Sequence, residues 1–157
     1  MSMKKSMAVC GCLIDEGRVL LEWRKNRNVL NDVWVLPGGK VEVLDFRIED
    51  AIIREMKEET DLDVSVMYEL PDFYKKVLRA RNGDLLIVEL HVFRITSPGA
   101  YLKFPAGDEF VWYDFNALNH NGEFRISPAQ MEADTEAFIL QCLELDETWE
   151  LYPEEMQ

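Results

Sequence analysis

Apolar and polar residues alternate along much of the chain, which is the pattern of strands that bury one face. Asn82-Gly83 lies between two such runs and predicts a tight hairpin. The run from Leu85 to Ile95 is the most apolar and is expected at the centre of a sheet, whereas residues 96–108, with two Pro and two Gly, are expected to form a loop. The predicted strands cover residues 7–14, 18–24, 33–36, 62–70, 73–78, 85–95 and 109–114.

Two other segments repeat apolar residues at the period of a helix. Ile48, Ile52 and Met56 recur every four residues and predict a helix over residues 48–60. Ser127-Pro128 is a favourable cap and first turn for a second helix, which is expected to end at about residue 145. Helices and strands in this order predict an α/β fold with a mixed sheet between helices.

The composition is that of one compact domain. The 157 residues are 48% hydrophobic, which suffices for one core, so residues 1–157 are expected to form a single domain. Residues 1–6 and the acidic end from about residue 147 are expected to be less ordered.

The chain is strongly acidic. Thirty Asp and Glu residues against 17 Lys and Arg give a formal net charge of −13. Binding to a nucleic acid polymer or to an anionic membrane needs clustered cations, so neither is an expected partner. A nucleotide-like anion would meet an acidic site, and metal ions with a few local cations must offset that repulsion.

The cysteines and the first residues are not interpreted as signals for secretion. Cys10, Cys12 and Cys142 do not form a disulfide framework, and Cys10 and Cys12 are interpreted as small apolar residues on one strand face rather than as a metal or redox pair. Lys4-Lys5 and the apolar stretch after it resemble a signal peptide, but a second strand follows at once, which indicates a hairpin. A reducing cytoplasm is the expected compartment.

Three carboxylates share one face of the first predicted helix. Glu55, Glu58 and Glu59 stand at i, i+3 and i+4, a short distance after the glycine turn Gly38-Gly39. Carboxylates at this spacing repel by roughly 0.2–0.5 kcal/mol per pair, so a fold that keeps three together favours a cation among them. Hard oxygen ligands suit Mg²⁺ or Mn²⁺. The alternative is a solvated Glu-rich surface beside an ordinary apolar stripe.

With their neighbours, these carboxylates resemble the signature of the Nudix hydrolase superfamily: Gly, five residues, Glu, seven residues, then Arg-Glu-apolar-any-Glu-Glu-any-Gly-apolar. Gly39 begins the match and Arg54 to Leu62 ends it. Asp45 stands at the first Glu, with one extra residue before Arg54, and Asp61 replaces the last Gly. Asp tolerates a left-handed helix end better than most residues, so the departure at Asp61 is compatible with the helix.

The resemblance implies an α/β/α sandwich and a set of site residues. Gly39, Glu55, Glu58 and Glu59 are the implied ligands of Mg²⁺ (or Mn²⁺), with Gly39 acting through its carbonyl. Glu58 and Glu59 are the main candidates for the carboxylate that activates water. Arg54 is implied to orient a helical Glu, and its i+4 spacing permits a pair with Glu58.

Other candidates lie outside the helix. Family members often carry a loop acid before a Trp, a place that Glu109 takes here, with Asp108 or a plain solvated loop as the alternatives. Arg24 follows a strand and is assigned, with Gly38 and Gly39, to substrate binding. Glu42 is open between a helper and a structural role.

His91 lies on the same strand face as Glu89, and a buried, hydrogen-bonded role is preferred to catalysis.

The implied reaction is hydrolysis of a nucleoside diphosphate linked to a group X, by water that attacks phosphorus in line and releases a nucleoside monophosphate. A nucleoside triphosphate or related nucleotide is expected by family analogy. One alternative is a Nudix-like sensor that binds a nucleotide without cleaving it, which the departures at Asp45 and Asp61 would permit. Another is a scaffold that uses the acidic tail. A homodimer is consistent with the family, although no residue identifies its interface.

Overall fold

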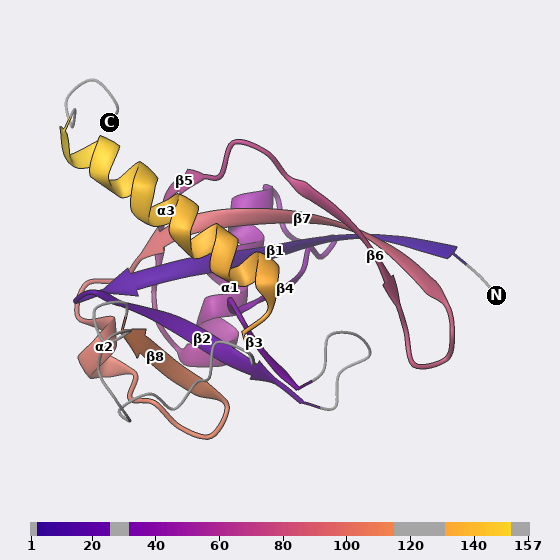
Figure 1. The fold of residues 1–157 in the computed structure, drawn as a ribbon, viewed down its shortest axis with the longest axis horizontal. Helices are drawn as coiled ribbons and strands as arrows, with labels where there is room; N and C mark the ends of the chain where they lie inside the picture. The colour runs from indigo at the N-terminus through magenta and orange to yellow at the C-terminus, as the bar shows by residue number, and fades with distance from the viewer. Residues whose placement is uncertain (1–2, 26–31, 115–130, 152–157) are drawn as a thin grey trace.

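The computed structural model describes residues 3–25, 32–114 and 131–151. A twisted sheet lies between helix α1 on one face and helix α3 on the other (Figure 1), as the predicted mixed sheet between helices requires. The helices are α1 (Ile48–Thr60), α2 (Ala100–Lys103) and α3 (Ala133–Leu151). The strands are β1 (Met3–Asp15), β2 (Arg18–Arg24), β3 (Val33–Val35), β4 (Gly38–Lys40), β5 (Ser65–Glu69), β6 (Tyr74–Arg79), β7 (Leu85–Thr96) and β8 (Phe110–Asp114).

Strands β1 and β7 form the centre of the sheet. They pair in parallel from Met3↔Leu85 to Leu13↔Ile95, and the other pairings between the named strands are antiparallel. The main order is β3-β2-β1-β7-β5, with β4 paired to β1, β6 to β7 and β8 to β2. The central place of the strand at 85–95 and the hairpin around Asn82-Gly83 are therefore confirmed.

Four boundaries differ from the prediction, each for a local reason. Strand β1 begins at Met3 because the first residues pair with β7, and β4 forms where only a glycine turn was expected. Helix α2 interrupts the predicted loop 96–108. Helix α3 continues to Leu151 rather than ending near 145, since no Gly or Pro occurs before Pro153. The predicted helix start at Ser127-Pro128 lies outside the described residues.

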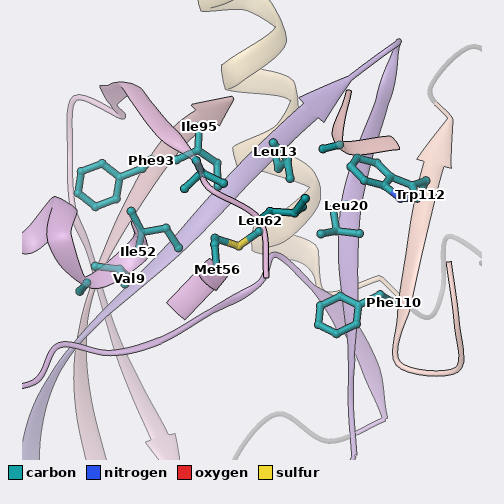
Figure 2. Close-up of a cluster of buried hydrophobic side chains, with 13 residues drawn as sticks. Val9, Leu13, Leu20, Ile52, Met56, Leu62, Phe93, Ile95, Phe110 and Trp112 are labelled. Carbon is teal, nitrogen blue, oxygen red and sulfur yellow. The ribbon is translucent and has the colours of Figure 1, made fainter. Parts of the chain in front are cut away.

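Two apolar cores flank the sheet. The core beneath α1 joins Ile52 and Met56 to side chains of β1, β2, β7 and β8 (Figure 2). The core beneath α3 contains Cys10, Cys12 and Cys142, which are buried free thiols, so their interpretation as small apolar residues is confirmed. Within the described parts of the chain, no helix is long and apolar enough to cross a membrane.

Candidate active site

Helix α1 presents its carboxylates from a firmly held position. Ile52 and Met56 are fully buried against the sheet, which fixes the rotation of the helix about its axis. The helix ends at Asp61, whose φ of 60° and ψ of 14° are left-handed, with its N–H bonded to the Lys57 carbonyl. The predicted helix end at this departure from the family signature is therefore confirmed.

The two glycines allow main chain and helix to approach. A Cβ on Gly38 would stand 2.0 Å from the Val9 carbonyl oxygen, and one on Gly39 would stand 2.5 Å from the Glu55 carboxyl carbon. Gly38 and Gly39 pair with Cys10 and Val9 in β4. The glycines thus let β4 lie between β1 and the Glu55 carboxylate, a place that a side chain would fill.

Arg54 gathers the charges of this region. We call Arg54 with Glu42, Asp45, Glu55 and Glu58 the Arg54 cluster. Its Nη1 donates to Glu55 Oε1 at 2.9 Å and to Glu58 Oε2 at 3.2 Å, which confirms the predicted pair with Glu58. Its Nη2 also donates to the Lys40 carbonyl at 3.0 Å. One guanidinium therefore ties the carboxylate helix to the end of β4.

Asp45 is the most buried acid of this cluster, with a side chain that is 4% exposed. Its two oxygens accept from Arg54 Nε and Nη2, both at 2.9 Å, and Oδ2 also accepts from the Glu42 N–H at 2.7 Å. The hydrogen bonds with Arg54 hold the pKa of Asp45 below its usual range. Asp45 therefore holds Arg54 and the loop, and the extra residue before the helix does not prevent this contact.

The three helical carboxylates differ in their surroundings. Burial raises the pKa of Glu55, whose side chain is 13% exposed, although Arg54 opposes that shift. Glu58 is 57% exposed. Glu59 is half-buried, and its Oε2 atom lies out of contact with solvent. The Glu42 carboxylate, whose side chain is 58% exposed, lies 3.6 Å from Arg54 Nη1.

The carboxylate and carbonyl oxygens of this region are the ligand types that a divalent cation prefers. The Gly39 main chain lies against the Glu55 carboxylate, and Glu55, Glu58 and Glu59 share one face of α1. Within the described ranges, no three His, Cys, Asp or Glu side chains are already gathered around one point. Glu55 and Glu58 meet instead on the Arg54 guanidinium, which occupies one oxygen of each and offsets their repulsion.

The structure places the remaining predicted site residues at strand ends. Glu109 immediately precedes β8 with an exposed side chain, and its carbonyl accepts from the Trp23 N–H at 2.7 Å. Arg24 is the last residue of β2 and pairs with Val33. The main chains that carry Glu109 and Arg24 are thus held side by side.

Sequence reasoning missed one buried acid, Glu22, and only partly described the surroundings of His91. Glu22 in β2 is 6% exposed, and the available signal was a lone Glu directly after the apolar run Val19–Leu21. His91 is buried as predicted, but it bonds two carboxylates: Nδ1 lies 2.8 Å from Glu69 and Nε2 lies 2.9 Å from Glu89. We call these three residues the His91 cluster.

Comparison with known proteins agrees with this arrangement. The family model described as the NUDIX domain matches residues 4–134, most of the chain. The chain belongs to the NUDIX family. An ADP-ribose pyrophosphatase of Methanocaldococcus jannaschii is 34% identical over 115 residues, which are 73% of this chain and 63% of that protein. The chain thus spans less than two thirds of the length of this NUDIX relative.

Solved structures share the NUDIX fold of this chain. A UDP-X diphosphatase superposes with a TM-score of 0.60 at 16% identity, over 89% of this chain and 63% of that one. A MutT NUDIX hydrolase from Burkholderia pseudomallei superposes with a TM-score of 0.53 at 21% identity, over 87% of this chain and 97% of that one. At these identities the likeness shows the fold alone, and the fold is the predicted α/β sandwich.

Proposed function

We propose that this chain hydrolyses a nucleoside diphosphate linked to a group X and releases a nucleoside monophosphate, with Mg²⁺ or Mn²⁺ as its cofactor. One observation carries the proposal: a single face of α1 presents Glu55, Glu58 and Glu59 beside the Gly39 main chain, with Arg54 tying Glu55 and Glu58 together. A solvated Glu-rich surface would not require a glycine against the Glu55 carboxylate or a guanidinium shared by Glu55 and Glu58.

Each residue has a role in the proposal. Glu55, Glu58, Glu59 and the Gly39 carbonyl would hold the cation, which when bound neutralises phosphate charge and lowers the pKa of water. Glu58 or Glu59 accepts the proton of the attacking water. Arg54 keeps Glu55 and Glu58 oriented, and its charge reduces the repulsion that an anionic substrate meets.

Products follow from where water attacks. Attack on one phosphorus breaks one P–O bond of the anhydride. A nucleoside monophosphate leaves, together with phosphorylated X, or with pyrophosphate where X is phosphate. Arg24, at the end of β2, and the glycines of β4 are proposed to contact the substrate phosphates.

The proposal favours two classes of substrate. Nucleoside triphosphates are favoured by analogy with small single-domain family members. ADP-ribose is favoured by the name of the relative that is 34% identical. The two classes are separable by their products, since a triphosphate gives pyrophosphate and ADP-ribose gives a sugar phosphate.

The test is product analysis with matched metal conditions. The protein is incubated with nucleoside triphosphates, ADP-ribose, nucleotide sugars and dinucleoside polyphosphates, each with Mg²⁺, Mn²⁺ or EDTA. Metal-dependent release of a nucleoside monophosphate by the native chain, and its loss in the double variant Glu58→Gln, Glu59→Gln, would support the proposal. Tight nucleotide binding without turnover under every metal condition would replace it with the sensor.

Glu109 is proposed to assist this reaction from the loop before β8. Glu109→Gln is expected to lower turnover at least tenfold without changing the unfolding midpoint, because its side chain is exposed. The neighbouring Asp108→Asn tests the alternative acid, as it removes the same charge one residue earlier in the loop. Turnover equal to that of the native chain would remove Glu109 from the mechanism.

A further inference from the structure

We infer that Glu22 is a further carboxylate of the divalent-cation site, supplied by the sheet opposite the carboxylate helix. The inference rests on the proposed function, because it adds a ligand to the same site. Neither the family signature nor the sequence pattern assigns Glu22 a role, since the signature lies wholly between Gly39 and Leu62.

The burial of Glu22 is unusual for its surroundings. Its relative exposure is 6%, and the three residues before it, Val19, Leu20 and Leu21, are fully buried apolar residues. Glu is almost never buried to this degree without a charged or hydrogen-bonding partner. An apolar residue would be the ordinary choice in this strand, and such departures from local rules tend to mark functional positions.

The register of the sheet places Glu22 between two segments of the candidate site. On one side it pairs with Phe110, the residue that follows Glu109. On the other side it pairs with Val35, from which the chain runs through Pro37 to the β4 glycines. Glu22 is thus the cross-strand neighbour of the segment that carries Glu109 and of the segment that leads to Gly39.

The side chain of Glu22 lies on the α1 face of the sheet. Successive residues of a strand point to opposite faces, so Glu22 shares the face of Leu20. Leu20 and Phe110 belong to the apolar core that contains Met56 of α1 (Figure 2). Met56 lies three residues before Glu59, so these two side chains share one side of α1.

A carboxylate in this position supplies what the helix lacks. The helical carboxylates approach a cation from one side, and the sheet side otherwise offers only the Gly39 main chain among the residues proposed as ligands. A charged oxygen ligand from β2 would oppose them, as hard cations with several oxygen ligands require. Because the described carboxylates are not gathered on one point, cation binding itself must be measured.

The experiment measures Mn²⁺ binding to the full chain without substrate, by titration calorimetry and by the electron paramagnetic resonance of free Mn²⁺. Glu22→Gln keeps the shape and removes the charge, and its Mn²⁺ affinity is expected to fall at least tenfold. Glu144→Gln, on an exposed position of α3, removes the same charge away from the site and should keep the native affinity. Thermal unfolding without metal is measured on all variants.

The outcomes separate a ligand from a structural acid. A ligand predicts weaker Mn²⁺ binding while the unfolding midpoint in the absence of metal stays close to that of Glu144→Gln. A structural acid predicts a lower midpoint with native Mn²⁺ affinity, which would overturn the inference.

A second variant keeps the inference testable if Glu22→Gln does not fold. Glu22→Asp keeps the charge and withdraws it by one methylene, so a ligand role again predicts weaker Mn²⁺ binding in a folded protein. Native affinity in that variant would overturn the inference. If the native chain turns over substrate and binds Mn²⁺ while both Glu22 variants match it, only this inference fails. If the native chain neither binds Mn²⁺ nor hydrolyses any substrate, the proposed function fails with it.

Discussion

Two clusters on the α1 face of the sheet each place one basic side chain, Arg54 or His91, among carboxylates, and they do so in opposite ways. Val9 of β1 pairs with Gly39 on one side and with His91 on the other, so the clusters lie on either side of the same central strand. The Arg54 cluster joins a helix to a loop and has outer carboxylates that are more than half exposed, Glu42 and Glu58. The His91 cluster joins two regular strands, β5 and β7.

The nature of the cation decides what each cluster can do. Arg54 is charged at every accessible pH and its five donors can be shared, so the carboxylates keep further oxygens for a ligand. The two ring nitrogens of His91 are both occupied, and its ring stacks on Phe73 with centroids 5.3 Å apart. The first cluster therefore keeps oxygens that the proposed function can use, whereas the second holds two strands together.

The largest expected effect tests the backbone on which the Arg54 cluster rests. Gly38→Ala would place a Cβ 2.0 Å from the Val9 carbonyl oxygen, and main chain cannot move aside as a side chain can. The free energy of unfolding is expected to fall by more than about 3 kcal/mol. Urea unfolding would measure this, with Gly107→Ala as the control, because no heavy atom lies within 4 Å of a Cβ built there. Equal stability of the two variants would show that β4 does not support the cluster.

The second-largest loss of stability is expected at Asp45, the most buried carboxylate of the Arg54 cluster. Asp45→Asn removes one charged acceptor of a bidentate pair and is expected to lower stability by about 2 kcal/mol at neutral pH. Asp63→Asn is the control, since that side chain is 91% exposed and its pair with Lys57 should contribute little.

The pH dependence of the stability of Asp45→Asn is a second, independent test of the ion pair between Asp45 and Arg54. Because the folded pKa of Asp45 lies below the ordinary value of 3.8, its stabilisation is present above that value and is lost as pH falls through the folded pKa. The difference between native and variant unfolding free energies should therefore shrink in strong acid. A difference that stays constant with pH would contradict the ion pair.

How far the sequence predicts these clusters depends on how local their contacts are. The pair between Arg54 and Glu58 follows from helical spacing, and the left-handed end at Asp61 follows from residue type. The bond from Asp45 to Arg54 spans nine residues and depends on the path of the intervening loop, which no periodicity encodes. The extra residue in that loop does not prevent the contact.

Pairing between strands is harder to predict. Strand β4 contains Gly38, Gly39 and Lys40, which carry no alternating pattern, and its pairing with β1 is made by backbone alone. Glu69 reaches His91 from a different strand, so only the known register reveals the second carboxylate. Glu22 followed an apolar run in the sequence, but its position opposite Phe110 and Val35 is likewise a property of the sheet.

A smaller, pH-dependent effect is expected from the His91 cluster. Burial opposes protonation of His91, but its hydrogen bonds with Glu89 and Glu69 outweigh burial and raise its pKa above 6.5. Its charged form is therefore stabilising at or below that pH, and the stabilisation is lost as pH rises through the folded pKa. His91→Gln is expected to lower stability by about 1–2 kcal/mol near pH 6 and by less in alkali.

Urea unfolding of the native chain and of His91→Gln, measured from pH 6 into the alkaline range, tests this prediction. Glu69, Glu89 and Phe73 contact the imidazole, and Lys75 lies 5.8 Å from the centre of the Phe73 ring. Lys75→Gln is the control for charge next to the cluster, and its effect should not depend on pH between 6 and 8. A cost of His91→Gln that grows with pH would mean that the ring is neutral in the fold.

The smallest expected change in stability belongs to Gly39→Ala, and it sharpens the contrast with its neighbour Gly38. The new Cβ would meet the Glu55 carboxylate at 2.5 Å, but that group is the end of a flexible side chain and can turn away. Stability should change by less than about 1 kcal/mol, because replacing Gly in an extended conformation also restricts the unfolded chain. Mn²⁺ affinity should nevertheless fall, because Glu55 leaves the Gly39 main chain. Native affinity in a folded Gly39→Ala protein would show that this approach does not form the cation site, while loss of folding would show that Glu55 cannot turn away.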